Sequence, residues 1–175
     1  MLNNSTFRGC RLLSGTTCIW IYRERMQTLM VEKSATAKWS GSLTEGKGTF
    51  STGSGLAKDS PVSWASRTND TRAETSPEEL IASAHAACYA MAFSHYLTTN
   101  HAAPESLEVT STVGFGPKPE GGMKVTHSHL KVVGSVPGMD AATFADAAKK
   151  AEGECPVSNA LRGNLEITVE ASLAG

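Results

Sequence analysis

The sequence lacks several features that mark well-known classes of protein. Its 16 basic and 17 acidic residues leave a formal net charge of -1, so no basic excess suggests binding to nucleic acid. No apolar run approaches the roughly 20 residues that a helix needs to cross a bilayer. There is no internal repeat and no low-complexity tract. We therefore expect a soluble protein with neither a nucleic-acid nor a membrane partner.

The four cysteines lie far apart and match no common cysteine motif. Cys10, Cys18, Cys88 and Cys155 show no Cys-x-x-Cys spacing of a zinc site or of a thioredoxin-like site. We expect no disulfide framework and, without a secretory signal, a cytoplasmic protein. In that compartment, widely separated cysteines are either buried and inert or used for chemistry. Their surroundings must decide between these two roles.

The first thirty residues differ in composition from the rest of the chain. They contain four arginines and a single acid, a bias that overlaps with that of organelle transit peptides. Met26 and Met30 also allow an upstream choice of start codon, which is the interpretation we favour. We expect residues 1–30 to be an extension outside the fold, with one domain over residues 31–175 and a sizeable core.

The stretch SPEELIASAHAACYAM, residues 76–91, predicts the central helix of the fold. Ser76 suits the N-cap and Pro77 the first helical position, where the missing N–H costs nothing. Glu79 can reach back to the backbone N–H of the cap. We expect this helix to end near Asn100.

One face of this predicted helix carries apolar residues at helical spacing, with a thiol in the middle. The stripe consists of Leu80, Ala84, Ala87 or Cys88, Met91 and His95. Cys88 should therefore be buried or nearly so. For an isolated case of this kind, an inert core cysteine is the simplest interpretation.

Segments on both sides of this helix alternate apolar and polar residues, as β-strands do. We expect strands near residues 35–39, 49–52, 62–66, 107–115, 123–136 and 165–171, with the last closing the sheet antiparallel. The pattern changes side within 123–136, which predicts a bulge or exposure on both faces. The order of elements indicates an α+β fold with antiparallel sheet wrapped on helices.

A second helix is predicted from Ala141 to Glu152, with Asp140 as its N-cap and Gly153 as its end. Cys155 would then cap a further helical turn whose first residue is Pro156. A thiolate at that cap would face free backbone N–H groups.

Chemistry at Cys88 would require a cation, because burial alone raises the pKa of a thiol. Arg67 and Arg72 are the nearest candidates in sequence, and Glu78 could fix a guanidinium by a two-pronged ion pair. His85, one turn before Cys88, could form a Cys/His pair, but a structural histidine is favoured.

A zinc site is a weaker alternative, because no pair of candidate ligands has a recognisable metal spacing. The scattered candidates are His85, Cys88, His95, His127, His129 and Cys155.

The run SPEELIASAHAACYAM together with ECPVSNAL resembles the OsmC/Ohr family of osmotically inducible and organic hydroperoxide resistance proteins, and most of all its OsmC branch. Supporting pieces are AKWSGSLTEGKGTFSTGSG, SRTND and VPGMDAATFADAAKKAEGECPVSNALRGNLEITVEASL. The likeness spans about Val31 to Leu173. It implies an OsmC-like fold and an intertwined homodimer, in which sheets from both chains surround central helices.

The resemblance also implies thiol-dependent reduction of organic hydroperoxides to alcohols, in defence against oxidative and osmotic stress. By position, Cys88 would be the peroxidatic cysteine that forms a sulfenic acid, and Cys155 the resolving cysteine that forms a disulfide with it. Arg67 would activate the thiolate, and Glu78 would orient Arg67. The resemblance implies no metal and no other cofactor, but an external dithiol or lipoyl-type reductant.

Apolar neighbours of Cys88 are predicted to line a substrate site that favours organic hydroperoxides over hydrogen peroxide. They are Leu80, Tyr89, Met91 and Phe93. The rival hypothesis is a non-enzymatic dimer that binds a small ligand and in which the cysteines only pack.

Overall fold

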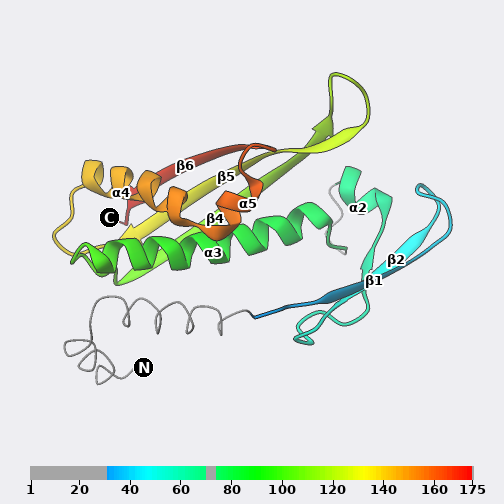
Figure 1. Ribbon diagram of the computed structural model, residues 1–175, viewed down its shortest axis with the longest axis horizontal. Helices are drawn as coiled ribbons and strands as arrows, with labels where there is room; N and C mark the ends of the chain where they lie inside the picture. Colours follow the sequence, from blue (N-terminus) through cyan, green and yellow to red (C-terminus); the bar gives the residue numbers. More distant parts are fainter. Residues whose placement is uncertain (1–30, 70–73, 175) are drawn as a thin grey trace, which may run out of the picture.

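The computed structural model describes residues 31–69 and 74–174, which form two three-stranded sheets and four helices. Figure 1 shows a body, built from the long helix α3 and the C-terminal sheet, and an arm made by the N-terminal sheet. The α+β fold class is confirmed. The predicted extension 1–30, with Cys10 and Cys18, lies outside the described residues, as does Arg72.

The arm is an antiparallel sheet in the order β1-β2-β3. Its strands are β1 (Ala35–Ser40), β2 (Lys47–Thr52) and β3 (Ser60–Val62). The strands predicted near residues 35–39 and 49–52 are confirmed, and they pair as a hairpin in which Trp39 lies opposite Gly48. A Cβ on Gly48 would lie 2.6 Å from the Trp39 ring, so glycine is needed for this close packing.

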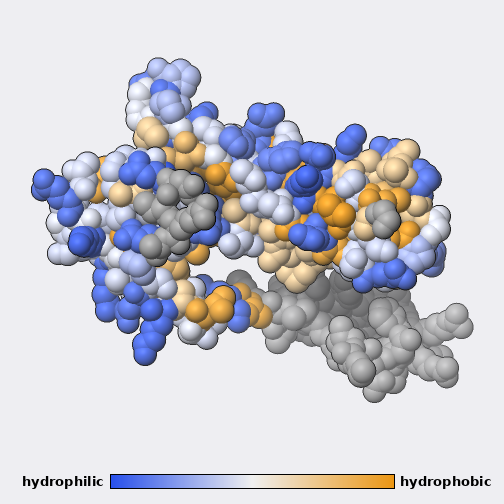
Figure 2. All heavy atoms as spheres, turned by 180° about the vertical axis from the view of Figure 1, so that it is seen from behind, coloured by the Kyte–Doolittle hydropathy of each residue, from blue (hydrophilic) through white to orange (hydrophobic). Residues whose placement is uncertain are grey.

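The arm projects from the body, and open space bordered by hydrophobic surface separates the start of β1 from it (Figure 2). Every residue of β1 is exposed, including the large Trp39 at 45 %. A strand without a buried face is unusual for a stable sheet, so one chain alone leaves this arm poorly packed.

A short helix, α2 (Trp64–Thr68), replaces most of the strand predicted for residues 62–66. That prediction is wrong because Ser63 and Ser66 form a capping box. The Ser66 N–H donates to Ser63 Oγ at 3.1 Å, and the Ser63 N–H donates to Ser66 Oγ at 3.2 Å. Two local hydrogen bonds therefore turn the chain immediately before Arg67.

Helix α3 (Pro77–Thr99) is confirmed with both of its predicted ends, the N-cap at Ser76 and the C-cap at Asn100. Only half of the expected capping box forms. Ser76 Oγ accepts from the Glu79 N–H, but the Glu79 carboxylate accepts from the Thr75 hydroxyl. No described helix, α3 included, is long and apolar enough to cross a membrane.

The body sheet has the order β4-β5-β6, formed by β4 (Ser106–Pro117), β5 (Met123–Ser135) and β6 (Glu166–Leu173). The prediction that the last strand pairs antiparallel is wrong, because β6 runs parallel to β5. Two helices connect these strands and make the crossover that parallel pairing needs. Between Val113 and Phe115 the partner moves from Ser128 to Val125, so β5 carries the predicted bulge.

The crossover helices are α4 (Ala141–Glu154) and α5 (Pro156–Leu161). Asp140 caps α4 as predicted, since its carboxylate accepts from two backbone N–H groups. Gly153 does not end the helix, which continues for one more residue. Cys155 separates the two helices as the C-cap of α4 and the N-cap of α5.

The core lies between the body sheet and the helices α3 and α4. Its fully buried side chains include Tyr89, Phe93, Leu97, Leu130, Val132 and Phe144. A Cβ on Gly134 of β5 would come within 2.6 Å of the Phe144 ring, so glycine lets α4 approach the sheet. This packing fixes α3, α4 and α5 against one another, and the junction of these helices holds both described cysteines.

Candidate active site

The two described cysteines lie beside each other as free thiols. Cys88 is half-buried in the middle of α3, whereas Cys155 is completely buried between α4 and α5. Cys155 Sγ accepts from the Ser158 N–H at 3.5 Å, as expected for a capping residue. Packing thus brings together two cysteines that are 67 positions apart in the sequence.

The surroundings of Cys88 do not favour its thiolate. Burial raises the pKa of the Cys88 thiol, and the neighbouring Cys155 thiol raises it further. The backbone of Val157 lowers the pKa by interacting with the sulfur, and it is the only described group that does so. Cys88 is therefore protonated at neutral pH within one chain, and a thiol in that state is a weak nucleophile.

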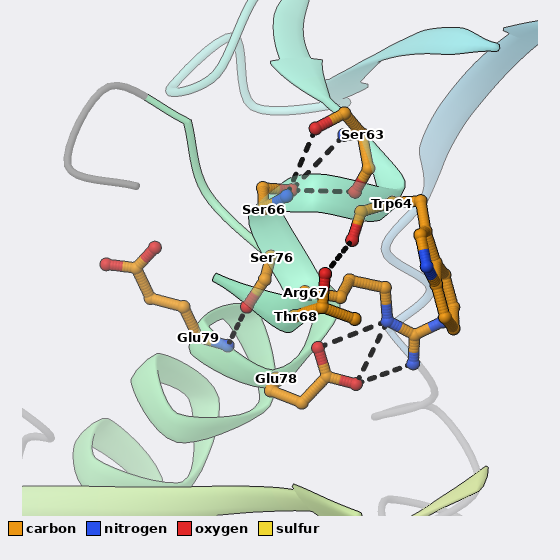
Figure 3. A network of polar contacts seen from close by, with 8 residues as sticks. All are labelled: Ser63, Trp64, Ser66, Arg67, Thr68, Ser76, Glu78 and Glu79. Carbon is orange, nitrogen blue, oxygen red and sulfur yellow. Dashed lines mark hydrogen bonds and ion pairs between the residues drawn. The ribbon is translucent and has the colours of Figure 1, made fainter. Parts of the chain in front are cut away.

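Arg67 and Glu78 form a second cluster, at the N-terminal end of α3 (Figure 3). Arg67 Nη2 donates to Glu78 Oε1 at 2.6 Å, and Nε donates to both carboxylate oxygens at 3.2 and 3.3 Å. Only 8 % of the Glu78 side chain is exposed, against 29 % for Arg67. The predicted two-pronged ion pair is present, and it fixes the orientation of the guanidinium.

Two aromatic rings lie beside the Arg67 guanidinium. Its central carbon lies 4.2 Å from the ring centre of Phe115 and 5.9 Å from that of Trp64. Nη1 has no hydrogen-bond acceptor within residues 31–69 and 74–174. The guanidinium therefore offers unused donors to a bound group, next to an apolar aromatic surface.

The four predicted site residues assemble as two pairs, which one chain does not bring together. Glu78 and Cys88 are ten positions apart on α3, a separation of about 15 Å along the helix axis. Arg67 is tied to Glu78, and it is not among the groups that shift the pKa of Cys88. Within one chain, the arginine pair and the cysteine pair are separate.

The apolar stripe predicted for α3 faces solvent, so this prediction is wrong. Leu80 and Met91 are 40 % and 67 % exposed, and Ala84, Ala87 and His95 are exposed as well. The buried face of α3 carries Glu78, His85, Tyr89, Phe93 and Leu97 instead. The sequence could not separate these two faces, because both carry apolar residues at helical spacing.

The predicted substrate wall is divided in the same way. Tyr89 and Phe93 are fully buried in the core, whereas Leu80 and Met91 lie on the exposed face. These four side chains cannot line one site within a single chain. A groove of about 550 Å³ does run along the exposed face, between residues 90–98 of α3 and residues 104–107.

His85 is a fully buried histidine with both ring nitrogens in hydrogen bonds. Nδ1 lies 2.7 Å from Ser128 Oγ, and Nε2 lies 2.8 Å from Ser158 Oγ. The ring faces these hydroxyls, so the structure gives no Cys/His pair with Cys88. Ser128 and Ser158 are 43 and 73 positions away from His85, so sequence spacing gave no signal for either contact.

Residues 31–69 and 74–174 contain no group of three His, Cys, Asp or Glu side chains that could hold a metal ion. His129 is engaged elsewhere, with Nδ1 2.7 Å from Thr168 Oγ1 and Nε2 3.6 Å from Glu170. The zinc alternative therefore has no site in this part of the chain.

Comparison with known proteins places the chain in a family. Residues 68–170 match the family described as OsmC-like protein. The chain is 39% identical to Peroxiredoxin OsmC of Escherichia coli over 145 residues, which are 83% of this chain and 99% of that protein. The chain belongs to the OsmC/Ohr family. Its match to the OsmC protein covers more of both chains than its matches to Ohr proteins, in agreement with the OsmC branch.

Ohr relatives within the OsmC/Ohr family are found as well. The chain is 35% identical over 96 residues to the Organic hydroperoxide resistance protein of Xanthomonas axonopodis pv. citri, which covers 54% of this chain and 65% of that one. A solved structure of an organic hydroperoxide resistance protein OsmC from Legionella pneumophila superimposes with a TM-score of 0.64 at 27% identity, covering 82% of this chain and 99% of that one. The OsmC-like fold is therefore confirmed.

Proposed function

We propose that this chain reduces organic hydroperoxides to alcohols through Cys88 and Cys155. The observation that carries the proposal is the contact of two free thiols, with a backbone N–H group directed at the sulfur of Cys155. A peroxidase-type role is also supported by relatives named peroxiredoxin and organic hydroperoxide resistance protein.

The first proposed step oxidises Cys88. Its thiolate attacks one oxygen of the hydroperoxide, an S–O bond forms and the O–O bond breaks. The electron pair of the O–O bond leaves on the alkoxide oxygen, which takes a proton to give the alcohol. Cys88 loses two electrons and becomes a sulfenic acid. A cation near the leaving oxygen would stabilise its developing charge.

The second proposed step joins the two cysteines. The Cys155 thiol gives up its proton as its sulfur attacks the Cys88 sulfur. An S–S bond forms, the S–O bond breaks, and the leaving hydroxide takes up a proton to give water. The contact between the two thiols allows this step without a large movement of the helices. An external dithiol, such as a lipoyl-type reductant, would then reduce the disulfide by exchange and return both thiols.

We further propose that the enzyme is a homodimer in which Arg67 of one copy serves Cys88 of the other. The position midway between Glu78 and Cys88 on α3 is Ser83. If two α3 helices pack antiparallel around a twofold axis near Ser83, residue 78 of one lies opposite residue 88 of the other. The exposed stripe of small residues on α3, with Ala84 and Ala87, suits such close packing.

The arm gives independent support for a dimer. Its strand β1 is exposed along its whole length, and it stands off the body of its own chain (Figure 1). A second copy would supply the surface that this sheet lacks. An intertwined dimer would thereby account for both uncovered regions, the arm and the outer face of α3.

The surroundings of Arg67 and Cys88 favour organic peroxides as substrates. The Trp64 and Phe115 rings pack edge to face on each other and lie beside the Arg67 guanidinium, so a peroxide held by its free donors would meet aromatic carbon. The exposed Met91 lies less than one turn beyond Cys88 on α3. Apolar surface of this kind favours an alkyl or aryl hydroperoxide over hydrogen peroxide.

The deciding experiment compares Cys88→Ser with Cys155→Ser, using cumene or tert-butyl hydroperoxide and a dithiol reductant. Cys88→Ser should abolish turnover. Cys155→Ser should still consume one equivalent of peroxide, because the first step needs only Cys88. Mass spectrometry should locate the added oxygen on Cys88. Undiminished turnover by Cys88→Ser would reject the mechanism.

A non-enzymatic, ligand-binding dimer is the second candidate, and the raised pKa of Cys88 in a single chain favours it. One equivalent of peroxide followed by peptide mapping separates the two candidates. The proposed enzyme should yield a peptide in which Cys88 and Cys155 are joined, with the loss of two hydrogens. The binding protein should show oxygen gain or no change.

A further inference from the structure

His85 is a buried histidine whose hydrogen-bond partners are serines and not the cysteines. It lies on α3 one turn before Cys88, and its ring is fully buried with both nitrogens hydrogen-bonded to hydroxyl groups. Its two partners come from different elements, Ser128 from β5 and Ser158 from α5. A single imidazole thus joins the helix of Cys88 to the helix that Cys155 caps.

The link through Ser158 continues to both sulfurs. The Ser158 backbone N–H donates to Cys155 Sγ, and the preceding residue, Val157, interacts with the Cys88 sulfur. The Ser158 hydroxyl is the atom bound by His85 Nε2. The side chain of this serine therefore fixes a backbone segment that contacts both thiols.

The link through Ser128 does not lead to the thiols. The Ser128 hydroxyl lies 2.7 Å from His85 Nδ1 and 3.1 Å from Ser111 Oγ, on the neighbouring strand β4. The Ser128 hydroxyl therefore connects the His85 ring to the body sheet. One hydrogen bond of His85 thus leads toward the sulfurs, and the other leads away from them.

We infer that His85 is a positioning residue that holds Cys155 against Cys88 through Ser158, and so controls the rate at which the two cysteines form a disulfide. Its place in a reaction cycle rests on the proposed function, because disulfide formation is the second step of that cycle. Burial lowers the pKa of His85, so the ring is neutral and offers one donor and one acceptor at pH 7.

The test compares Ser158→Ala with Ser128→Ala, at two buried serines that each share one hydrogen bond with the same ring. The oxidant is diamide, an azo dicarboxamide that takes two electrons and two protons as two thiols become a disulfide. It needs no peroxidase activity. Peptide mapping over time measures formation of the Cys88–Cys155 bond in the full chain, and thermal melting measures the stability of each variant.

We expect Ser158→Ala to slow formation of the disulfide about tenfold or more, and Ser128→Ala to change it by less than about twofold. Equal slowing of disulfide formation in both variants would mean that the ring only stabilises the fold. No slowing in either variant would mean that the hydrogen bond between His85 and Ser158 does not position the cysteines. Both results overturn the inference, as does a wild-type protein that diamide does not crosslink at these two positions.

A second pair of variants covers the case in which Ser158→Ala does not fold. His85→Gln places an amide near the Nε2 position, toward Ser158, whereas His85→Asn places one near Nδ1, toward Ser128. We expect His85→Gln to form the disulfide faster than His85→Asn, and the reverse order or equal rates would overturn the inference. If diamide gives these results but peroxide oxidises no cysteine in the wild type, the proposed function fails while the positioning role stands.

Discussion

The two ends of the candidate site differ in how completely one chain builds them. The cysteine pair lies in the body, where α3, α4 and α5 pack on a sheet and bury Cys155 entirely. The arginine pair lies at the other end of α3, beside an arm that its own chain leaves uncovered. One chain therefore builds the cysteine pair completely, whereas activation of the Cys88 thiol, as we propose, requires an arginine of a second copy.

The largest expected effect is a loss of stability on substitution of a core residue in the body. Phe144 is fully buried, with its ring 5.1 Å from that of Phe93. Phe144→Ala should lower the free energy of unfolding by about 3–5 kcal/mol, through lost burial and a cavity. Urea denaturation followed by circular dichroism measures this change.

The matched variant in the arm is Trp39→Ala. Because Trp39 is 45 % exposed in a single chain, its loss should cost only about 1 kcal/mol when both variants are unfolded as monomers at low protein concentration. Equal losses for Trp39→Ala and Phe144→Ala would show that arm and body contribute alike to stability.

The next effect concerns Arg67, which we propose activates the Cys88 thiol. Arg67→Ala should slow peroxide oxidation of Cys88 by about 10²–10³-fold, as removal of a charge-stabilising donor does in other enzymes. Arg67→Lys should recover only part of the rate, since a lysine cannot reproduce the two-pronged contact with Glu78. Stopped-flow measurement of thiol loss gives these rates.

Mixing two inactive variants decides which copy supplies Arg67. Co-refolded Arg67→Ala and Cys88→Ser chains should regain about a quarter of the wild-type activity, because half of the dimers then contain one complete site. If Arg67 served Cys88 of its own chain, no mixed dimer would be active.

A smaller change should follow when the outer face of α3 receives a charge. Ala87→Glu would bury an unpaired carboxylate in the proposed interface, so we expect monomers at concentrations where the wild type is dimeric. Ala142→Glu, on the exposed first turn of α4, is the control and should stay dimeric. Analytical ultracentrifugation measures both, and a wild-type monomer would contradict the dimer.

The smallest expected effect is a dependence of stability on pH from His85. Burial lowers the pKa of folded His85, against a weaker opposing effect of Glu152, below the 6.5 of an ordinary histidine. As the pH falls through 6.5, the unfolded chain takes up a proton before the folded chain does, so stability falls. His85→Gln lacks this group, and its urea midpoint should fall less between pH 8 and pH values below 6.5. If the urea midpoints of the wild type and His85→Gln fell equally with pH, the lowered pKa of His85 would be contradicted.

Local patterns predicted much of the fold, because capping and turn formation involve residues close in sequence. The ends of α3, the start of α4 and the cap at Cys155 were all correct for this reason. The short helix α2 is not predicted although its signal is local, since residues 62–66, which include the Ser63–Ser66 capping box, also fit the pattern of a strand.

The sequence by itself determined the family, the main elements and the identity of the four candidate residues, whose roles stay predictions. Only the tertiary structure decided which face of α3 is buried, that β6 runs parallel to β5, and that the four residues fall into two pairs. The physical reason is that these properties depend on contacts between distant segments. Apolar residues on a helix have the same spacing whether their face packs on the sheet of the same chain or, as we propose for the outer face of α3, on a second chain.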